Sequence, residues 1–85
     1  MVTKLLTIKN EKGLHLRSAA ALASICRPFD AQVALIFNQN EYNLKSVLGI
    51  VGAGVRHGDT VEVSCNGSDQ EQAMQAIEEA INKGL

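Results

Sequence analysis

The feature that most constrains the fold is a set of stretches in which polar and apolar residues alternate with a period of two. The clearest is TVEVSCN at positions 60–66, where Val61, Val63 and Cys65 share one face and the residues between them are polar. This alternation predicts strands of a sheet that is buried on one side only. The strands expected on this basis are residues 2–8, 31–37, 60–66 and a short edge strand at 41–44.

Between Leu16 and Arg27 the period changes to that of a helix, and Pro28 ends the pattern. The inward stripe of this helix is expected to contain Leu16, Ala19, Ala20, Ala23 and Cys26, widened by Leu22 and Ile25. A second long helix is predicted near the end of the chain, where Ser68 and Glu71 have the spacing of a capping box. Its apolar stripe comprises Ala73, Ile77, Ala80 and Ile81.

Residues 47–53 are predicted to form a short helix that begins after Ser46, whose hydroxyl is suited to an N-cap. The elements then follow the order strand, helix, strand, strand, short helix, strand, helix. Strands with one polar and one apolar face form a sheet whose apolar face must be buried, and we expect the helices to pack against that face. The chain is therefore expected to form one domain, residues 1–85, with an open-faced two-layer α/β sandwich as its architecture.

Composition narrows the classes of function. The chain of 85 residues has no Trp, one Tyr and two Phe, and its net charge is −1, which argues against nucleic-acid binding. Residues 1–57 contain seven Lys or Arg and three acids, whereas residues 58–85 contain one and six. We therefore expect a basic face suited to acidic partners.

Cys26 and Cys65 lack C-x-x-C spacing and are interpreted as buried hydrophobic residues rather than as a disulfide or a zinc site. No cofactor or metal site is predicted, because His57 is the only other imidazole and no carboxylate pattern accompanies it. The N-terminus does not have the pattern of a signal peptide, and no apolar run is long enough to cross a bilayer. A cytoplasmic protein without membrane insertion is the expectation.

The candidate chemistry lies at His15, between the glycine turn and the first helix. There the amides of Leu16, Arg17 and Ser18 have no partner within the helix, so the position attracts anions. A phosphoryl group on the imidazole would meet those amides, and the Arg17 guanidinium suits phosphate oxygens. The alternative is that His15 serves only as a helix cap.

The segment Gly13-Leu14-His15-Leu16-Arg17-Ser18-Ala19-Ala20 resembles the G-L-H-A-R-P-A motif of the HPr family, the histidine-containing phosphocarriers of the phosphoenolpyruvate-dependent sugar phosphotransferase system. The resemblance covers the whole chain, including the segment Lys45 to Gly49 and the final helix. It implies an α+β fold in which three helices cover one face of a four-stranded antiparallel sheet. It also implies that Nδ1 of His15 accepts phosphate from phospho-enzyme I and passes it to an enzyme IIA domain.

The same resemblance implies a docking surface for both partners. Its residues are Leu16, Arg27, Lys45, Val47, Leu48 and Val51. Two positions depart from the family pattern, which commonly has proline in place of Ser18 and a small residue in place of Leu16. Because a serine has an amide hydrogen and no ring, Ser18 is expected to restore a donor and to loosen the turn.

The family counterpart of Ser46 is phosphorylated by a dedicated kinase in many bacteria, so Ser46 is a candidate regulatory site, with an ordinary N-cap as the alternative. HPr kinase/phosphorylase and a transcriptional regulator are then further candidate partners. The protein itself is expected to be a monomer. Two other functions stay open at this point. The chain could be an HPr-like regulatory module that does not pass phosphate onward, or a small α/β ligand-binding domain without phosphate chemistry.

Overall fold

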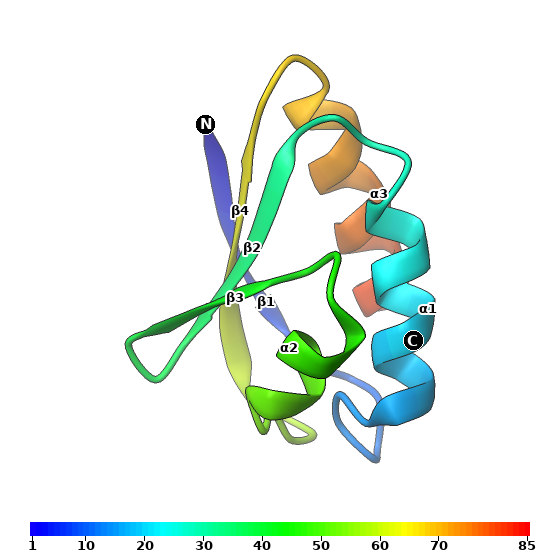
Figure 1. Cartoon of the computed structure of the whole chain (residues 1–85). Helices are drawn as coiled ribbons and strands as arrows, with labels where there is room; N and C mark the ends of the chain where they lie inside the picture. Colours follow the sequence, from blue (N-terminus) through cyan, green and yellow to red (C-terminus); the bar gives the residue numbers. More distant parts are fainter.

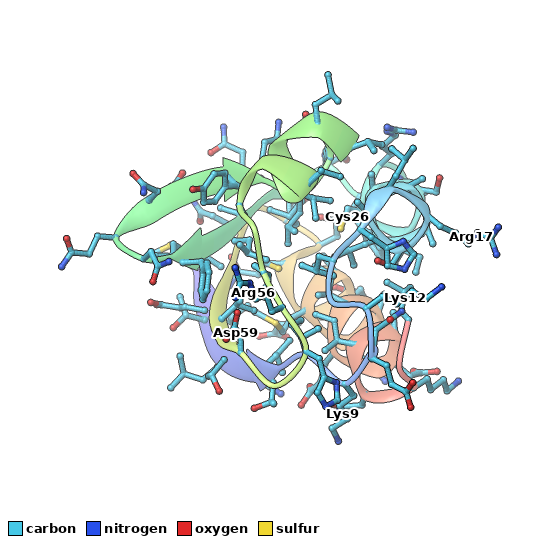
Figure 2. The ribbon with its side chains drawn as sticks, turned by 90° about the horizontal axis from the view of Figure 1, so that it is seen from below. Lys9, Lys12, Arg17, Cys26, Arg56 and Asp59 are labelled. Atoms are coloured by element: carbon cyan, nitrogen blue, oxygen red, sulfur yellow. The ribbon has the colours of Figure 1, made fainter.

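The computed structural model describes residues 1–85 and has a four-stranded sheet with three helices on one face (Figure 1). Along the chain the elements are β1 (Val2–Thr7), α1 (Leu16–Cys26), β2 (Gln32–Phe37), β3 (Asn40–Asn43), α2 (Val47–Gly52), β4 (Thr60–Asn66) and α3 (Gln70–Asn82). All neighbouring strands are antiparallel, in the order β1-β4-β2-β3. The predicted α+β fold is confirmed, and Figure 2 shows its two layers from below.

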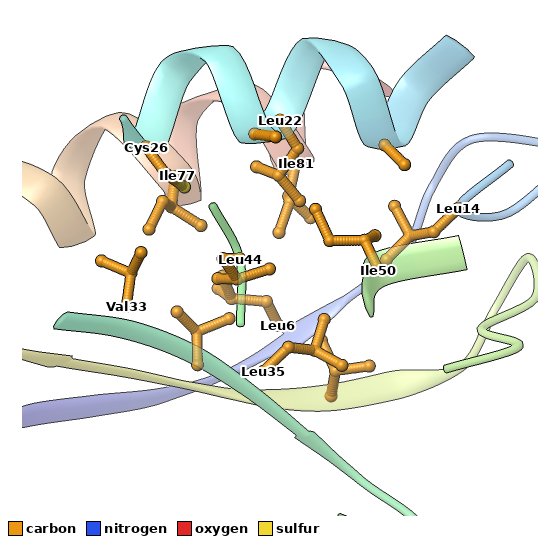
Figure 3. Close-up of a cluster of buried hydrophobic side chains, with 14 of the residues drawn as sticks. Leu6, Leu14, Leu22, Cys26, Val33, Leu35, Leu44, Ile50, Ile77 and Ile81 are labelled. Atoms are coloured by element: carbon orange, nitrogen blue, oxygen red, sulfur yellow. The ribbon is translucent and has the colours of Figure 1, made fainter. Parts of the chain in front are cut away.

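The core lies between the helices and the inner face of the sheet (Figure 3). At its centre Val63 of β4 stands opposite Lys4 of β1 on one side and Leu35 of β2 on the other. The three apolar residues predicted to point inward from residues 60–66 are fully buried. The outer face has no covering layer, and Leu5 on it is 72% exposed. The period-two pattern therefore gave the correct inner face.

The predicted stripe of α1 is wrong at Leu16 and Ala20, which are both exposed. The buried side of this helix is formed instead by Ser18, Ala19, Leu22, Ala23 and Cys26. Successive residues of a helix turn by about 100°, so Leu16 and Ala20 lie to the side of the line through Ala19 and Leu22. The error arose because a run of alanines and leucines allows more than one apolar face.

The capping box predicted at Ser68 and Glu71 is absent. Asp69 is the N-cap of α3, and its side chain makes no cap hydrogen bond. Its carboxylate instead accepts hydrogen bonds from the backbone amides of Asp30 at 2.8 Å and Ala31 at 2.9 Å. The Asp30 amide is the main reason that the pKa of the Asp69 carboxyl lies below its ordinary value. The side chain of Asp69, just before α3, therefore binds the loop between α1 and β2 instead of capping its own helix.

Both cysteines are free and buried, as predicted. Cys26 faces the sheet from the last turn of α1. Desolvation, together with the nearby Cys65, raises the pKa of the Cys26 thiol to about 12. Desolvation also raises the pKa of Cys65. The two residues therefore act as small hydrophobic groups in the folded protein.

None of the three helices combines the length and the apolar character that a membrane-crossing segment needs.

Candidate functional site

The turn before α1 is closely packed against the segment that precedes β4. Gly13 has a φ of +69°, and a Cβ at this position would lie 2.4 Å from the Val55 carbonyl oxygen. The next residue, Leu14, is buried and donates its amide hydrogen to the same carbonyl at 3.0 Å. Only glycine fits this conformation and this space, so Gly13 sets the direction in which the chain enters α1.

His15 is the N-cap of α1, in the position predicted from the sequence. Its backbone is extended, its side chain is half-buried, and its Nδ1 accepts a hydrogen bond from the Arg17 amide at 3.3 Å. Because an N–H points at Nδ1, this nitrogen has no hydrogen, and the neutral ring carries its proton on Nε2. The unprotonated nitrogen is thus the one that faces the beginning of the helix.

The first amides of α1 have few competing acceptors. The Leu16 amide makes no hydrogen bond within the chain, whereas the amides of Arg17 and Ser18 are engaged only by the His15 side chain. Arg17 makes the long bond to Nδ1, and Ser18, as the third helical residue, completes a capping box with His15. The first i to i−4 bond of the helix is donated by Ala19 to the His15 carbonyl at 2.8 Å. At the positive end of the helix dipole, one donor is therefore free and two are bonded only to the imidazole, and all three lie next to the position of an anion on that ring.

Ser18 tightens the turn, which corrects the expectation that it loosens it. Its side chain is buried, and its Oγ accepts a hydrogen bond from the His15 amide at 3.0 Å. The same hydroxyl donates to the Gly13 carbonyl at 3.1 Å, with the His15 carbonyl as a second acceptor at 3.2 Å. Ser18 thereby ties the first turn of the helix to the residue that bends the chain.

His15 lies in an open surface depression together with Arg17, whose exposed side chain extends away from the helix (Figure 2). Two further basic residues of this depression, Lys9 and Lys12, were missed by the sequence analysis. Their nearness to His15 along the chain was the available signal. The depression is lined by Lys9, Asn10, Glu11, Lys12, His15, Leu16, Arg17, Ala20 and Gly84.

The apolar residues predicted for docking are on the surface, where α2 packs beside α1 (Figure 1). Leu16 is 66% exposed, Leu48 80% and Val51 37%. Val47 differs from them because it is half-buried and packs against the core. Exposed leucines on neighbouring helices are typical of a surface that binds a partner.

The two predicted basic docking residues, Arg27 and Lys45, are tied to each other. Arg27 follows α1 and donates from Nε to the Lys45 carbonyl at 3.3 Å. Lys45 is half-buried, and its Nζ donates to the Phe29 carbonyl at 2.6 Å. These residues lie at the far end of α1 from His15, a separation of about 16 Å along the 11-residue helix. The structure therefore does not bring them into the depression around His15.

Ser46 is the N-cap of α2, as predicted. Its Oγ accepts a hydrogen bond from the Gly49 amide at 3.1 Å, and the side chain is half-buried. Leu48, the most exposed apolar residue of α2, is two positions further along the chain. A chemical change at Ser46 would therefore act at the edge of the apolar surface.

No three His, Cys, Asp or Glu residues are grouped so that they could hold a metal ion. The second histidine, His57, is exposed, and its Nδ1 lies 3.2 Å from the Asn10 carbonyl oxygen. Asn10 also donates from Nδ2 to the Leu85 carbonyl at 2.7 Å. In the structure, His57 thus makes a contact between two loops.

Comparison with known proteins gives consistent results. The family described as "PTS HPr component phosphorylation site" matches residues 2–83. The Phosphocarrier protein HPr of Mycoplasma genitalium is 34% identical over 77 residues, which are 89% of this chain and 88% of that protein. The chain belongs to the HPr family. A member of this family is a phosphocarrier of the phosphotransferase system and not a catalytic enzyme.

Solved structures agree with the assignment to the HPr family. HPr-C-His from Thermoanaerobacter tengcongensis superposes with a TM-score of 0.95 at 33% identity, over 99% of this chain and 94% of that one. The histidine-containing phosphocarrier protein of Mycoplasma has a TM-score of 0.91 at 29% identity, over 99% and 97% of the two chains. The fold of the family is therefore present along the entire chain.

Proposed function

We propose that this HPr-family chain accepts a phosphoryl group on Nδ1 of His15 from phospho-enzyme I in the cytoplasm and passes it to enzyme IIA domains. The observation that supports this most is the direction of the ring. Nδ1 is unprotonated and faces the first amides of α1, so a phosphoryl group bonded to it would lie at the positive end of the helix.

The transfer step follows from this geometry. The Nδ1 lone pair attacks the phosphorus of the donor, an N–P bond forms, and the bond from phosphorus to the donor atom breaks, leaving its electron pair on the donor. His15 needs no general base, since its proton is already on Nε2. The ring must first give up the 3.3 Å bond from Arg17, which then becomes free to donate to a phosphoryl oxygen.

Arg17 and the helix amides stabilise the charge of the transferred group. The guanidinium provides a permanent positive charge with a forked set of donors. The Leu16 amide has no other acceptor, and the Ser18 amide is bonded only to the His15 side chain. A group held at an exposed helix terminus remains accessible to the next acceptor. The site is thus suited to a carrier that must both receive and release the phosphoryl group.

Partner binding is assigned to the exposed side chains of Leu16, Leu48 and Val51. A small apolar centre beside basic residues suits a transient interface whose encounter is guided by charge. Enzyme I and the IIA domains would both use it, since each must bring its own phosphorylated or accepting group to His15. Arg27 is exposed at the other end of α1 and can contribute at the rim of that interface.

Incubation with enzyme I and labelled phosphoenolpyruvate tests the carrier function directly. The native chain should acquire an acid-labile label, His15→Ala should acquire none, and His57→Ala should be labelled like the native chain. Addition of an enzyme IIA domain should then remove the label. A labelled protein that no IIA domain discharges would favour the regulatory module instead, and labelling of His15→Ala would contradict the assignment of the site.

We further propose Ser46 as a regulatory phosphorylation site for an HPr kinase/phosphorylase. A phosphate here stays at a helix N-terminus, so it should alter docking beside Leu48 rather than unfold α2. Ser46→Asp should accept phosphate from enzyme I more slowly than Ser46→Ala while unfolding at no lower urea concentration. Equal transfer rates in the two variants would contradict regulation at this position.

A further inference from the structure

The cationic side chains of this protein fall into two groups. Of its eight Lys and Arg side chains, four have a hydrogen bond or an ion pair within the chain, namely Lys4, Arg27, Lys45 and Lys83. The other four make no such contact through their charged groups, and these are Lys9, Lys12, Arg17 and Arg56. The second group is free to interact with a ligand.

Three of the four unpaired cations line the depression that contains His15. Lys9, Lys12 and Arg17 are all exposed there, and Glu11 is the single acidic residue of the lining. A surface that gathers unpaired positive charge around one nucleophilic ring is suited to a dianionic group on that ring. Arg17 alone would leave the two lysines unexplained.

The turn that carries Lys12 is held in place. The Lys12 amide donates to Asn10 Oδ1 at 2.9 Å, and the Gly13 amide donates to the Asn10 carbonyl at 2.9 Å. Asn10 is itself bonded to the Leu85 carbonyl through its side chain. The backbone of Lys12 therefore has a defined position beside His15, although its long side chain remains free to move.

Lys12 and Arg17 project from the same side of the molecule, whereas Lys9 points elsewhere (Figure 2). We infer that Lys12 is a second phosphoryl-binding side chain, which, like Arg17, meets the oxygens of a phosphoryl group on His15. Lys9 adds only longer-range attraction. This inference rests on the proposed function of His15 and assigns to its site a residue outside the α1 helix.

Lys12 acts as a point charge, while the Arg17 guanidinium offers a planar fork of donors. Both favour the dianionic form of the bound group over its singly protonated form. A cation close to the phosphoryl oxygens lowers the pKa of their second ionisation, and salt weakens the effect because the site is open to solvent. The pH at which the phosphoryl group loses its last proton therefore tests whether Lys12 lies close to it.

The test uses phosphoramidate, which phosphorylates histidine without enzyme I: an N–P bond forms at His15, the P–N bond of the reagent breaks, and ammonia leaves. The phosphorus NMR signal is then followed against pH, with His15→Ala identifying any signal from His57. In Lys12→Gln the titration midpoint should rise by about half a pH unit. Lys12→Arg should restore it, Lys9→Gln should shift it less, and Arg56→Gln should leave it unchanged.

An unchanged midpoint in Lys12→Gln, or an equal rise in Arg56→Gln, would overturn the inference, provided that amide spectra show both variants folded. The effect in Lys12→Gln should also diminish at high salt. Because the reagent replaces enzyme I, failure of the carrier assay and failure of this test are separate results. A protein that enzyme I does not phosphorylate could still show the midpoint shift, and a working carrier could lack it.

Discussion

At the scale of single residues, Ser18 shows how one hydroxyl can define a functional turn. Its Oγ accepts a hydrogen bond from the His15 amide and donates one to the Gly13 carbonyl. The backbone of His15 is thereby fixed to the preceding glycine turn. Asp69 works in a similar way at the opposite end of α1, where its carboxylate receives two amides of the following loop. Ser18 thus acts within the first turn of its own helix, whereas Asp69 acts on a loop that is distant in the sequence.

Ser18→Ala should lower the free energy of unfolding by about 1–2 kcal/mol, because the His15 amide loses its acceptor in a partly buried place. Urea denaturation measures this. The control is Ser24→Ala, an exposed position of the same helix, which should be neutral or slightly stabilising. If the two variants were equally stable, the hydroxyl of Ser18 would have no structural importance.

Asp69→Asn should destabilise the protein at neutral pH, because an amide NH₂ would face at least one of the two backbone donors. The pKa of Asp69 is lowered on folding, so its contribution is present above the unfolded-state value of about 3.9 and is lost as the pH falls through the lower folded value.

The difference in unfolding free energy between native protein and Asp69→Asn should accordingly be constant at neutral pH and shrink below about pH 4. Denaturation curves at several pH values would measure it. Glu41→Gln, at an exposed position of β3, is the matched control and should show little difference at any pH. A difference for Asp69→Asn that persists unchanged into acid would contradict the assignment.

At the scale of elements, α1 and α2 form the functional side of the molecule and the sheet provides its support. The glycine turn directs the beginning of α1, and α2 packs beside it with Ile50 fully buried. This packing leaves Leu16 of α1 and Leu48 of α2 on the surface. The short helix therefore adds little to the core and exposes Leu48 more than any other large apolar residue.

Leu48→Ser should leave stability within about 0.5 kcal/mol, since the side chain is 80% exposed, but should raise the KM for phosphorylation by enzyme I about fivefold or more. Leu5→Ser is the control, because Leu5 is 72% exposed on the uncovered face of the sheet. Steady-state transfer assays compare the two. Similar KM values for both variants would show that Leu48 of α2 is not part of the docking surface.

At the scale of the whole molecule, the core is a single layer between helices and sheet, and both cysteines lie in it. Cys26 comes from α1 and Cys65 from β4, so exposure of the pair requires the two layers to separate. The raised pKa of the Cys26 thiol, about 12, also keeps it protonated at physiological pH.

Thiol labelling should therefore follow global unfolding. At about pH 8 the native protein should react very slowly with an aromatic disulfide reagent, and both thiols should react at once in concentrated urea. At intermediate urea the labelling rate should rise in parallel with the unfolded fraction measured by circular dichroism. Rapid labelling of one thiol in native buffer would indicate local opening of the core instead.

The sequence by itself determined the strands, the helices and the position of His15. These depend on local physics: a period of two or of about 3.6, a proline after α1 and a glycine in the turn before it. Each signal lies within a few residues of the element that it predicts. The inner face of β4 could accordingly be read without knowledge of its neighbours.

Only the tertiary structure decided which polar groups meet. The Asp69 carboxylate accepts hydrogen bonds from the amides of Asp30 and Ala31, and the Lys45 ammonium donates one to the Phe29 carbonyl. These partners are far apart in the sequence, so no local pattern of residues predicts the bonds. The exposure of Leu16 was decided in the same way, by how α1 rotates against the sheet. Hydrogen-bond partners and helix rotation depend on close packing between distant segments, which a linear pattern of residue types does not specify.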